Sequence, residues 1–319
     1  VRQQNFISDD ADFIRYDATI STSEDQTAIT SGKLISKTCQ NGRNIFHYKS
    51  EQPMINYFAV LSAELNRKSE VWHPSDNTSD SVQLSVLYHS GHDYNIEIML
   101  DAMKQSLSYY DSVYTSYPFS QLSIVEFPRY ARYAQSFPNM IPYSEGIGFI
   151  ADLEGADNNA ATIAKRKINY PYWFVSHEVA HQWWAHQLIA ADAEGAQFLM
   201  ESVTQYSAYK VMQNKYGDKL IRKLKREEAF KYISSRSQMP VAERPLHKVT
   251  GKQQSIYYQK GAIEFFALSK KLGERTLEKS LREFLKQYAF QPAPYPLSTD
   301  FIEILKDNSP DSLQSVIND

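Results

Sequence analysis

The pattern of hydrophobic and polar residues divides this chain into a first part with short strands and a second part with helices. In the strand-like runs apolar and polar residues alternate between polar turns, and these runs cover residues 13–20, 33–36, 44–48, 82–88 and 121–126. Between the last two runs, residues 93–114 have helical spacing. Their apolar face consists of Ile96, Met99, Leu100, Met103, Leu107 and Tyr110. From Tyr172 onward the pattern predicts mostly helices.

Three polar segments are assigned to turns or to the surface. Asn77–Asp80 is predicted to form a turn. His89 and His92 lie in the turn before the helix at 93–114 and have no matching acidic partner in the sequence nearby, so we treat them as loop residues. The charged run Lys223–Glu228 lies on a predicted helix and is expected to form a solvated face.

One apolar segment, Val175–Trp184, contains the sequence His-Glu-x-x-His. Residues four apart lie on one face of a helix, so His177 and His181 can bind one metal ion between them. Glu178 lies about 100° further around the helix, where a general base for an activated water is placed. Neutral imidazole is a ligand that suits zinc. The segment therefore predicts a zinc hydrolase.

The apolar residues around this motif also fit a core helix that binds no metal. They are Trp173, Phe174, Val175, Val179, Ala180, Trp183 and Trp184. A core helix gains nothing from two His and a Glu, because buried charges cost free energy unless they are paired or bound to metal. This cost favours the zinc interpretation.

A catalytic zinc takes three protein ligands and leaves a fourth position open. His186 has the wrong spacing from His181 for the zinc proteases that use a third His, so we expect it beside the site or on the surface. Glu194 lies in a predicted turn. Glu201 begins a second helical stretch that ends before Gly217, and it can reach the metal from there. We choose Glu201, although a Glu at a helix N-terminus is also favoured by its charge alone.

These residues resemble the aminopeptidase N family of zinc metallopeptidases, which are gluzincins. That family has His-Glu-x-x-His-Gln-Trp and, on the next helix, Asn-Glu-Gly-Phe-Ala-x-Tyr. Here Met200–Tyr206 keeps the Glu and the Tyr of the second motif, and the spacing from His181 to Glu201 is one residue longer than usual. The resemblance implies one zinc ion per chain, bound by His177, His181 and Glu201.

The resemblance extends from about Asp12 to the C-terminus and implies an α+β fold. We expect residues 1–62 to be the C-terminal part of an N-terminal β-domain. Residues 63–319 are expected to form a thermolysin-like catalytic domain, with a small mixed sheet and a mostly helical half. The long C-terminal helical domain of the family is absent from this sequence.

A segment before the zinc motif resembles the substrate-binding strand of the family. Ser144–Ile150 is similar to Gly-x-Met-Glu-Asn-Trp-Gly-Leu-Ile, whose Glu binds the free α-amino group of a peptide. The match implies this role for Glu145, although Pro142 and Gly146 replace the Gly and the Asn of the motif. The alternative is an edge strand with one exposed Glu.

A segment after the zinc motif resembles the Tyr-x-Lys-Gly-Ala sequence of the family, whose Tyr stabilises the oxyanion of the reaction. Tyr258 takes this place, because Lys260-Gly261-Ala262 follows at the right distance. The same spacing excludes Tyr257 as the better candidate.

The resulting hypothesis is a zinc-dependent peptidase that removes N-terminal residues from peptides, with Glu178 as the general base. Trp183-Trp184 and the longer spacing look most like a bacterial subgroup fused to ABC-transporter permeases. That likeness implies membrane domains outside this chain and an extracytoplasmic location for this domain. The rival hypothesis is a zinc-bearing domain that binds or senses peptides for a transporter without cleaving them.

Composition adds limits to this hypothesis. The net charge of −3 and the lack of a basic tract argue against nucleic-acid binding. No apolar run approaches the length of a membrane span, so we expect this stretch of sequence to be soluble. Val1-Arg2-Gln3-Gln4 is not a natural start, which indicates a piece of a longer protein. The single Cys39 excludes an internal disulfide.

Overall fold

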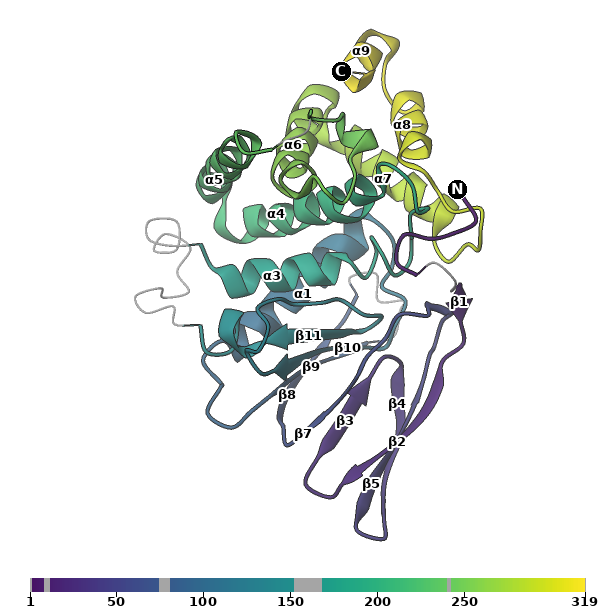
Figure 1. Ribbon diagram of the computed structural model, residues 1–319, viewed down its shortest axis with the longest axis vertical. Helices are drawn as coiled ribbons and strands as arrows, with labels where there is room; N and C mark the ends of the chain where they lie inside the picture. The colour runs from purple at the N-terminus through teal and green to yellow at the C-terminus, as the bar shows by residue number, and fades with distance from the viewer. Residues whose placement is uncertain (1, 9–11, 75–80, 152–167, 240–241, 319) are drawn as a thin grey trace.

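The computed structural model describes residues 2–8, 12–74, 81–151, 168–239 and 242–318. Strands occupy one end of the molecule and helices the other (Figure 1). The turn expected at Asn77–Asp80 lies outside the described residues. The α+β class predicted from the sequence is confirmed.

The N-terminal strands form three small sheets. The strands are β1 (Phe13–Ile14), β2 (Asp17–Ser23), β3 (Thr27–Thr30), β4 (Lys33–Gln40), β5 (Arg43–Lys49), β6 (Met54–Ile55) and β7 (Val60–Ala63). They pair as β2-β5-β4, β3-β7 and β1-β6, all antiparallel. The run predicted at 13–20 is split, because the backbone N–H of Tyr16 bonds to Ser50 Oγ at 2.9 Å instead of to a strand.

A second, four-stranded sheet follows, built from β8 (Asn66–Trp72), β9 (Val82–Tyr88), β10 (Gln121–Phe127) and β11 (Met140–Ser144). The strand order is β11-β10-β9-β8. β9, β10 and β11 are parallel, and β8 is antiparallel to β9. The carboxyl ends of the three parallel strands therefore lie at one edge of this sheet. The hydrogen-bonded sheet changes between β7 and β8, close to the predicted boundary at residues 62 and 63, which stays a prediction.

The helices cover one face of this sheet and form the rest of the molecule (Figure 1). They are α1 (Ile96–Val113), α3 (Tyr170–Ala180), α4 (Val203–Tyr216), α5 (Asp218–Arg236), α6 (Gly261–Leu272), α7 (Glu274–Tyr288), α8 (Ser298–Asp307) and α9 (Gln314–Asn318). The short helical turns are η1 (Glu145–Ile147), η2 (Phe198–Ser202), η3 (Leu246–Lys248), η4 (Ile256–Lys260) and η5 (Asp311–Leu313). The helix predicted at 93–114 is confirmed, and its six apolar residues are buried.

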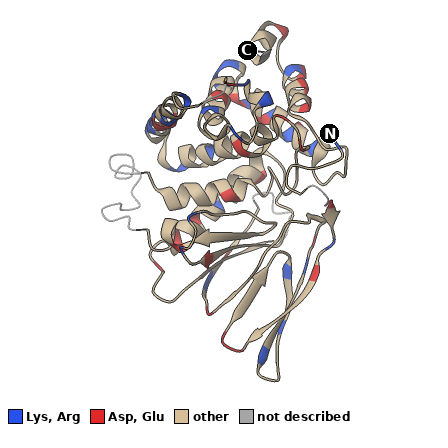
Figure 2. Cartoon of the chain, in the orientation of Figure 1, with Lys and Arg blue, Asp and Glu red and all other residues tan. Residues whose placement is uncertain are grey.

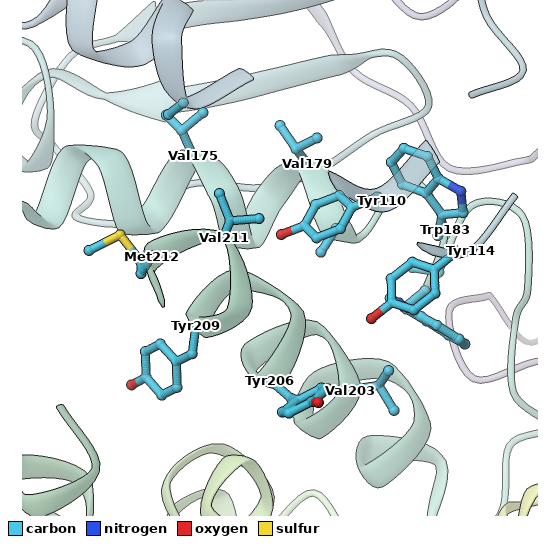
Figure 3. Close-up of a cluster of buried hydrophobic side chains, with 14 of the residues drawn as sticks. Tyr110, Tyr114, Val175, Val179, Trp183, Val203, Tyr206, Tyr209, Val211 and Met212 are labelled. Atoms are coloured by element: carbon cyan, nitrogen blue, oxygen red, sulfur yellow. The ribbon is translucent and has the colours of Figure 1, made fainter. Parts of the chain in front are cut away.

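The core between α1, α3 and α4 contains both aromatic and aliphatic side chains (Figure 3). In Figure 3 the labelled side chains of α3 are valines, and those of α1 and its C-cap are tyrosines. Several of their polar ends bond to a neighbouring element. Tyr110 donates to the carbonyl of Ser176 at 2.8 Å, and the hydroxyl of Tyr114 lies 2.8 Å from Ser207 Oγ. Such bonds satisfy the polar ends of buried aromatic side chains, and they fix α3 and α4 against α1.

The outer helices carry both signs of charge, interspersed along their surfaces (Figure 2). None of the helices in the described part of the chain combines the length and the apolar composition that a membrane crossing requires. The prediction of a solvated face at Lys223–Glu228 is partly wrong. Leu224 and Glu228 are buried, because four residues of an α-helix turn through more than one full turn and bring both positions onto the inner face.

Candidate active site

Helix α3 presents the His-Glu-x-x-His segment. The side chain of Asn169 caps its first turn by accepting from the N–H of Tyr172 at 3.1 Å. α3 ends at Ala180, and His181 is its C-cap with helical backbone angles. The rings of His177 and His181 are therefore neighbours, with centroids 4.8 Å apart.

Glu201 completes a group of three metal-type side chains. Its Oε2 lies 3.5 Å from His177 Nε2 and 3.6 Å from His181 Nε2. All three ligand atoms lie within 4.8 Å of one another. Glu201 Oε2 is buried, and among the described residues it has no hydrogen-bond partner. Two imidazole nitrogens and one such carboxylate oxygen form a donor set that fits zinc and leaves a position open.

Glu201 lies in η2, a π-helical turn that precedes α4, and such turns are frequent at functional sites. Burial alone would raise the pKa of its carboxyl. The rings of His181 and His177 and a hydrogen bond with Tyr258 outweigh burial and lower the pKa to about 2. The carboxyl group is thus an anion at neutral pH, as a metal ligand must be.

The second nitrogen of each imidazole is fixed by the protein. His177 Nδ1 lies 2.9 Å from Gln205 Oε1, and Gln205 in turn donates to the hydroxyl of Tyr209 at 2.9 Å. His181 Nδ1 lies 3.0 Å from the carbonyl of Trp184. With Nδ1 donating, Nε2 keeps its lone pair toward the metal position, which is the usual arrangement of zinc-binding His.

Glu178 lies beside this group and is buried. Burial raises the pKa of its carboxyl to about 7 against the opposing effect of His181, and the negative charge of Glu201 adds to the rise. A backbone hydrogen bond from Ser136 acts in the other direction. A carboxylate whose pKa lies near the working pH is suited to accept and return a proton.

Tyr258 belongs to the π-helical turn η4. Its ring centroid lies 6.1 Å from that of His177. Burial and the charge of Glu201 raise the pKa of its hydroxyl far above the ordinary value, so the group stays protonated and can donate a hydrogen bond. Tyr258, His177 and Glu178 line one cavity of about 320 Å³, a volume at the lower end of those found for ligand sites.

The Lys-Gly-Ala sequence after Tyr258 has a packing reason. A Cβ at Gly261 would collide with Ser202, the residue after Glu201. Ser202 Oγ also donates to the carbonyl of Tyr257 at 2.6 Å. This close approach fixes η4 against η2, which sets Tyr258 beside Glu201. Tyr257 does not line the cavity.

An extended segment at residues 132–137 borders the site, and the sequence did not reveal it. It pairs with β11: the N–H of Gln135 bonds to Pro142 O at 3.0 Å, and the N–H of Ser144 bonds to Tyr133 O at 3.1 Å. β11 is therefore not the edge beside the metal group. Since alternate residues of an extended chain point their polar groups to opposite sides, the N–H and C=O of Ala134 point away from β11.

This segment is clamped to the zinc-motif helix by Gln182, the residue after His181. Gln182 Nε2 donates to Ser136 Oγ at 2.7 Å and to Phe137 O at 2.9 Å, and its Oε1 accepts from the N–H of Asn139 at 2.8 Å. The only signal in the sequence was Gln182 itself. Its partners lie more than 40 residues upstream, so local spacing could not predict the contact.

Glu145 is placed elsewhere. It begins η1 directly after β11, and it lines neither of the two cavities that touch the metal group. One of its oxygens lies 3.4 Å from Arg129 Nε, and the other lies 3.9 Å from His92 Nδ1. The structure therefore does not bring Glu145 together with the other predicted site residues, because the segment at 132–137 lies between β11 and α3.

The structure also places His186 and Glu194, the two residues rejected as the third metal ligand. Of the two positions expected for His186, the structure has the one beside the site: His186 is buried and lines a cavity with His181 and Glu201. Burial lowers its pKa to about 3, so it is neutral. Glu194 is exposed and paired with Arg244, away from the metal group, as expected for a turn residue.

His89 and His92 lie in the loop between β9 and α1, as expected, but the expectation that they have no acidic partner is wrong. Both rings contact the carboxylate of Glu126, which comes from the adjacent strand β10. The sequence could not show this pairing, because Glu126 is 34 residues from His92 and meets it only through the parallel pairing of β9 and β10.

Comparison with known proteins agrees with this geometry. The model of the peptidase family M1 domain matches residues 98–319. The chain belongs to peptidase family M1. This confirms the family resemblance drawn from the sequence, while fusion to a permease stays a prediction.

Curated M1 relatives are distant and longer. Aminopeptidase M1-B of Oryza sativa subsp. japonica is 20% identical over 313 residues, which are 95% of this chain and 33% of that protein. Aminopeptidase M1-C of the same plant is 22% identical over 294 residues, or 88% of this chain and 31% of that protein. The chain thus spans about a third of the length of these relatives.

Solved M1 structures share the fold. An M1 zinc metallopeptidase from Deinococcus radiodurans has a TM-score of 0.70 at 15% identity, over 95% of this chain and 63% of that one. Legionella pneumophila aminopeptidase A, in complex with aspartic acid, has a TM-score of 0.71 at 16% identity, over 95% of this chain and 34% of that one. The likeness supports the catalytic-domain fold expected from the sequence.

Proposed function

We propose that this chain is a zinc-dependent aminopeptidase. The observation that carries the proposal is that the group of His177, His181 and Glu201 lies between two cavities. Glu178 and Tyr258 line one of these cavities together with His177. Elements that are far apart in the sequence supply these groups. The pKa shifts keep Glu201 ionised and Tyr258 protonated at neutral pH, and the pKa of Glu178 is raised to about 7. A buried helix with only a structural role would not require this set of ionisable groups.

His177, His181 and Glu201 would bind the zinc ion. When bound, zinc activates a water molecule and polarises the carbonyl group of the substrate. Glu178 takes a proton from the attacking water and passes it to the leaving amine, a role that suits a carboxylate beside the site. Tyr258 donates its hydroxyl hydrogen to the carbonyl oxygen as that atom becomes negative.

The segment at 132–137 supports a peptide as the substrate. The outward N–H and C=O of Ala134 can pair with an extended peptide, as an added strand pairs with a sheet edge. Residues on this segment line both cavities beside the metal group: Arg132, Tyr133 and Ala134 line one, and Gln135 and Ser136 line the other. A peptide along this edge would cross the site between Glu178 and Tyr258.

Cleavage at the amino terminus is supported by relatives, not by Glu145. The rice relatives are named aminopeptidases, and a related M1 zinc metallopeptidase from Deinococcus radiodurans was solved bound to a Tyr-Ser-Ala substrate. Flanking membrane domains, as implied by the likeness to permease-fused proteins, stay a prediction about the longer protein.

The proposal is tested by measuring hydrolysis of aminoacyl amides by the wild-type protein and by Glu178→Gln. Gln keeps the shape of Glu178 and removes the base, so the rate should fall by about 10²–10⁴-fold. Glu194→Gln, on the exposed turn, is the matched control and should retain the wild-type rate. A wild-type protein that contains zinc but hydrolyses no peptide or amide would leave a binding domain as the better interpretation.

A further inference from the structure

A second group of metal-type side chains lies at the carboxyl edge of the four-stranded sheet. The parallel strands β9, β10 and β11 all end at this edge. His89 directly follows β9, Glu126 is the next-to-last residue of β10, and Glu145 directly follows β11. His92 belongs to the turn between β9 and α1. Strand topology therefore brings four potential ligands from four separate positions to one place.

The ligand atoms of this group converge. His92 Nδ1 contacts Glu126 Oε1, and His89 Nδ1 lies 3.2 Å from Glu126 Oε2. The ligand atoms of His89, His92 and Glu126 all lie within 4.8 Å of one another, as do those of the active-site group. Glu145 Oε2 lies 3.9 Å from His92 Nδ1, so a fourth ligand is within reach.

Among the described residues, the carboxylate of Glu126 has only His side chains as ion-pair partners. Its side chain is 0% exposed, and in the described residues no Lys or Arg forms an ion pair with it. Burying a carboxylate without a counter-charge is costly. A divalent cation would offset the charges of Glu126 and Glu145 together.

The ring of His89 gives a second indication of a metal ion at this group. Its Nδ1 is buried and, among the described residues, makes no hydrogen bond, although it lies 3.2 Å from Glu126 Oε2. The Oε2 atom instead accepts the backbone N–H of His89 at 2.6 Å. A metal ion would use the lone pair of this nitrogen.

The positions of the ligands are held by the surrounding chain. Asn95, at the start of α1, donates to the carbonyl of Gly148 at 2.6 Å, which ties the turn containing His92 to the turn containing Glu145. The two His side chains are partly open to solvent: His89 is 32% exposed and His92 is 29% exposed. The site is preorganised and an ion can reach it from solvent.

We propose that His89, His92 and Glu126 bind a second divalent metal ion of the zinc, cobalt or manganese type, with Glu145 as a fourth ligand. Two imidazoles with one or two carboxylates suit such ions. Arg129, which is 68% exposed, pairs with Glu145 and is free to move away when the ion binds. The ion would join the ends of β9, β10 and β11 to the start of α1, which is a structural role.

The experiment counts metal ions per chain by elemental analysis after removal of loosely bound metal. The wild-type protein should contain two ions per chain, and His89→Ala/His92→Ala should contain one. A His177→Ala/His181→Ala variant, which removes the active-site ligands, should retain one ion and lose it when His89→Ala/His92→Ala is added. His47→Ala is the matched control, because His47 is a partly exposed His paired with Asp17 on β2 and should change no count.

Cobalt titration gives a second readout that is independent of hydrolysis. The His177→Ala/His181→Ala variant should develop cobalt absorption bands with one ion per chain, and its unfolding temperature should rise with added metal. Glu126→Gln in the same background should abolish both effects. If the folded His177→Ala/His181→Ala variant binds no zinc, cobalt or manganese, the group is only a hydrogen-bonded network. An ion that survives His89→Ala/His92→Ala in the His177→Ala/His181→Ala background lies elsewhere, which also overturns the proposal.

Discussion

Two groups of the same composition, two His and one Glu, lie in different structural settings. The group of His177, His181 and Glu201 is carried by helical elements and lies next to two cavities. The group of His89, His92 and Glu126 is carried by strand ends and a turn, and its residues line neither of those cavities. The ligand set alone therefore does not distinguish the proposed catalytic site from the proposed structural one.

The two groups differ in the residues that lie beside them. Beside the helical group stand Glu178, whose pKa is raised to about 7, and Tyr258, whose hydroxyl stays protonated. These two groups can move and donate protons next to a substrate. Beside the strand-end group lie Glu145 and Arg129, which pair with each other. Only the first setting supplies a base, a hydrogen-bond donor and space for a substrate.

The largest effect expected from this contrast is loss of the active-site metal. His177→Ala and Glu201→Ala should each lose one ion and all measurable hydrolysis, because each removes one of three ligands. His89→Ala should leave kcat close to the wild-type value. Elemental analysis and initial rates on the same preparations check this.

Two controls sharpen that test. His186→Ala and Glu194→Ala should keep the active-site ion, since neither residue contributes to the group of three. Metal retained by Glu201→Ala but lost from Glu194→Ala would contradict the choice of the third ligand.

The next effect concerns Tyr258. Tyr258→Phe should lower kcat by about 10²-fold with little change in KM, because its hydrogen bond strengthens chiefly in the transition state. Tyr257→Phe is the matched change one residue away and should keep kcat near wild type. Steady-state kinetics on one peptide amide decide between the two. The reverse result would mean that the hydroxyl of Tyr257 faces the substrate.

The contrast also explains what the sequence could reveal. His177 and His181 lie four residues apart on one helix, so their shared face follows from helix geometry. Tyr258 could be identified by the Lys-Gly-Ala sequence that follows it. The glycine of that sequence, Gly261, is needed because a Cβ there would collide with Ser202. The amphipathic helix at 93–114 and the strands at 82–88 and 121–126 follow equally from local periodicity.

Features that depend on strand pairing were missed. Glu126 joins His89 and His92 only because β9 and β10 are parallel neighbours. The segment at 132–137 reaches the site only because it pairs with β11 and is clamped by Gln182. Glu145 was matched by sequence to a strand motif, but in the structure its oxygens face Arg129 and His92. Its role in binding the substrate stays a prediction. Local patterns do not encode such contacts.

A smaller effect is expected from Gln205, which orients His177 through its bond to Nδ1. Gln205→Ala should reduce zinc affinity or kcat by about 10–100-fold, as for other groups that orient metal ligands. Competition with a chelator measures the affinity. Gln213→Ala, further along α4 and bonded to Lys210 and Asp218, is the control and should leave zinc affinity unchanged. An unchanged affinity in Gln205→Ala would mean that α3 packing alone fixes the ring.

The smallest effect on catalysis is expected from Glu145→Ala, and it decides to which of the two groups this residue belongs. Glu145 lines neither cavity beside the active-site ligands, and its oxygens face Arg129 and His92. The variant should therefore change kcat/KM by less than about threefold, as is usual for substitutions away from a site. The change should be the same for a peptide with a free amino terminus and for its N-acetylated form.

The wild-type protein should prefer the free form if it is an aminopeptidase. If Glu145→Ala weakens cleavage of the free peptide much more than that of the acetylated one, Glu145 binds the substrate's ammonium group after all, and it belongs to the active site.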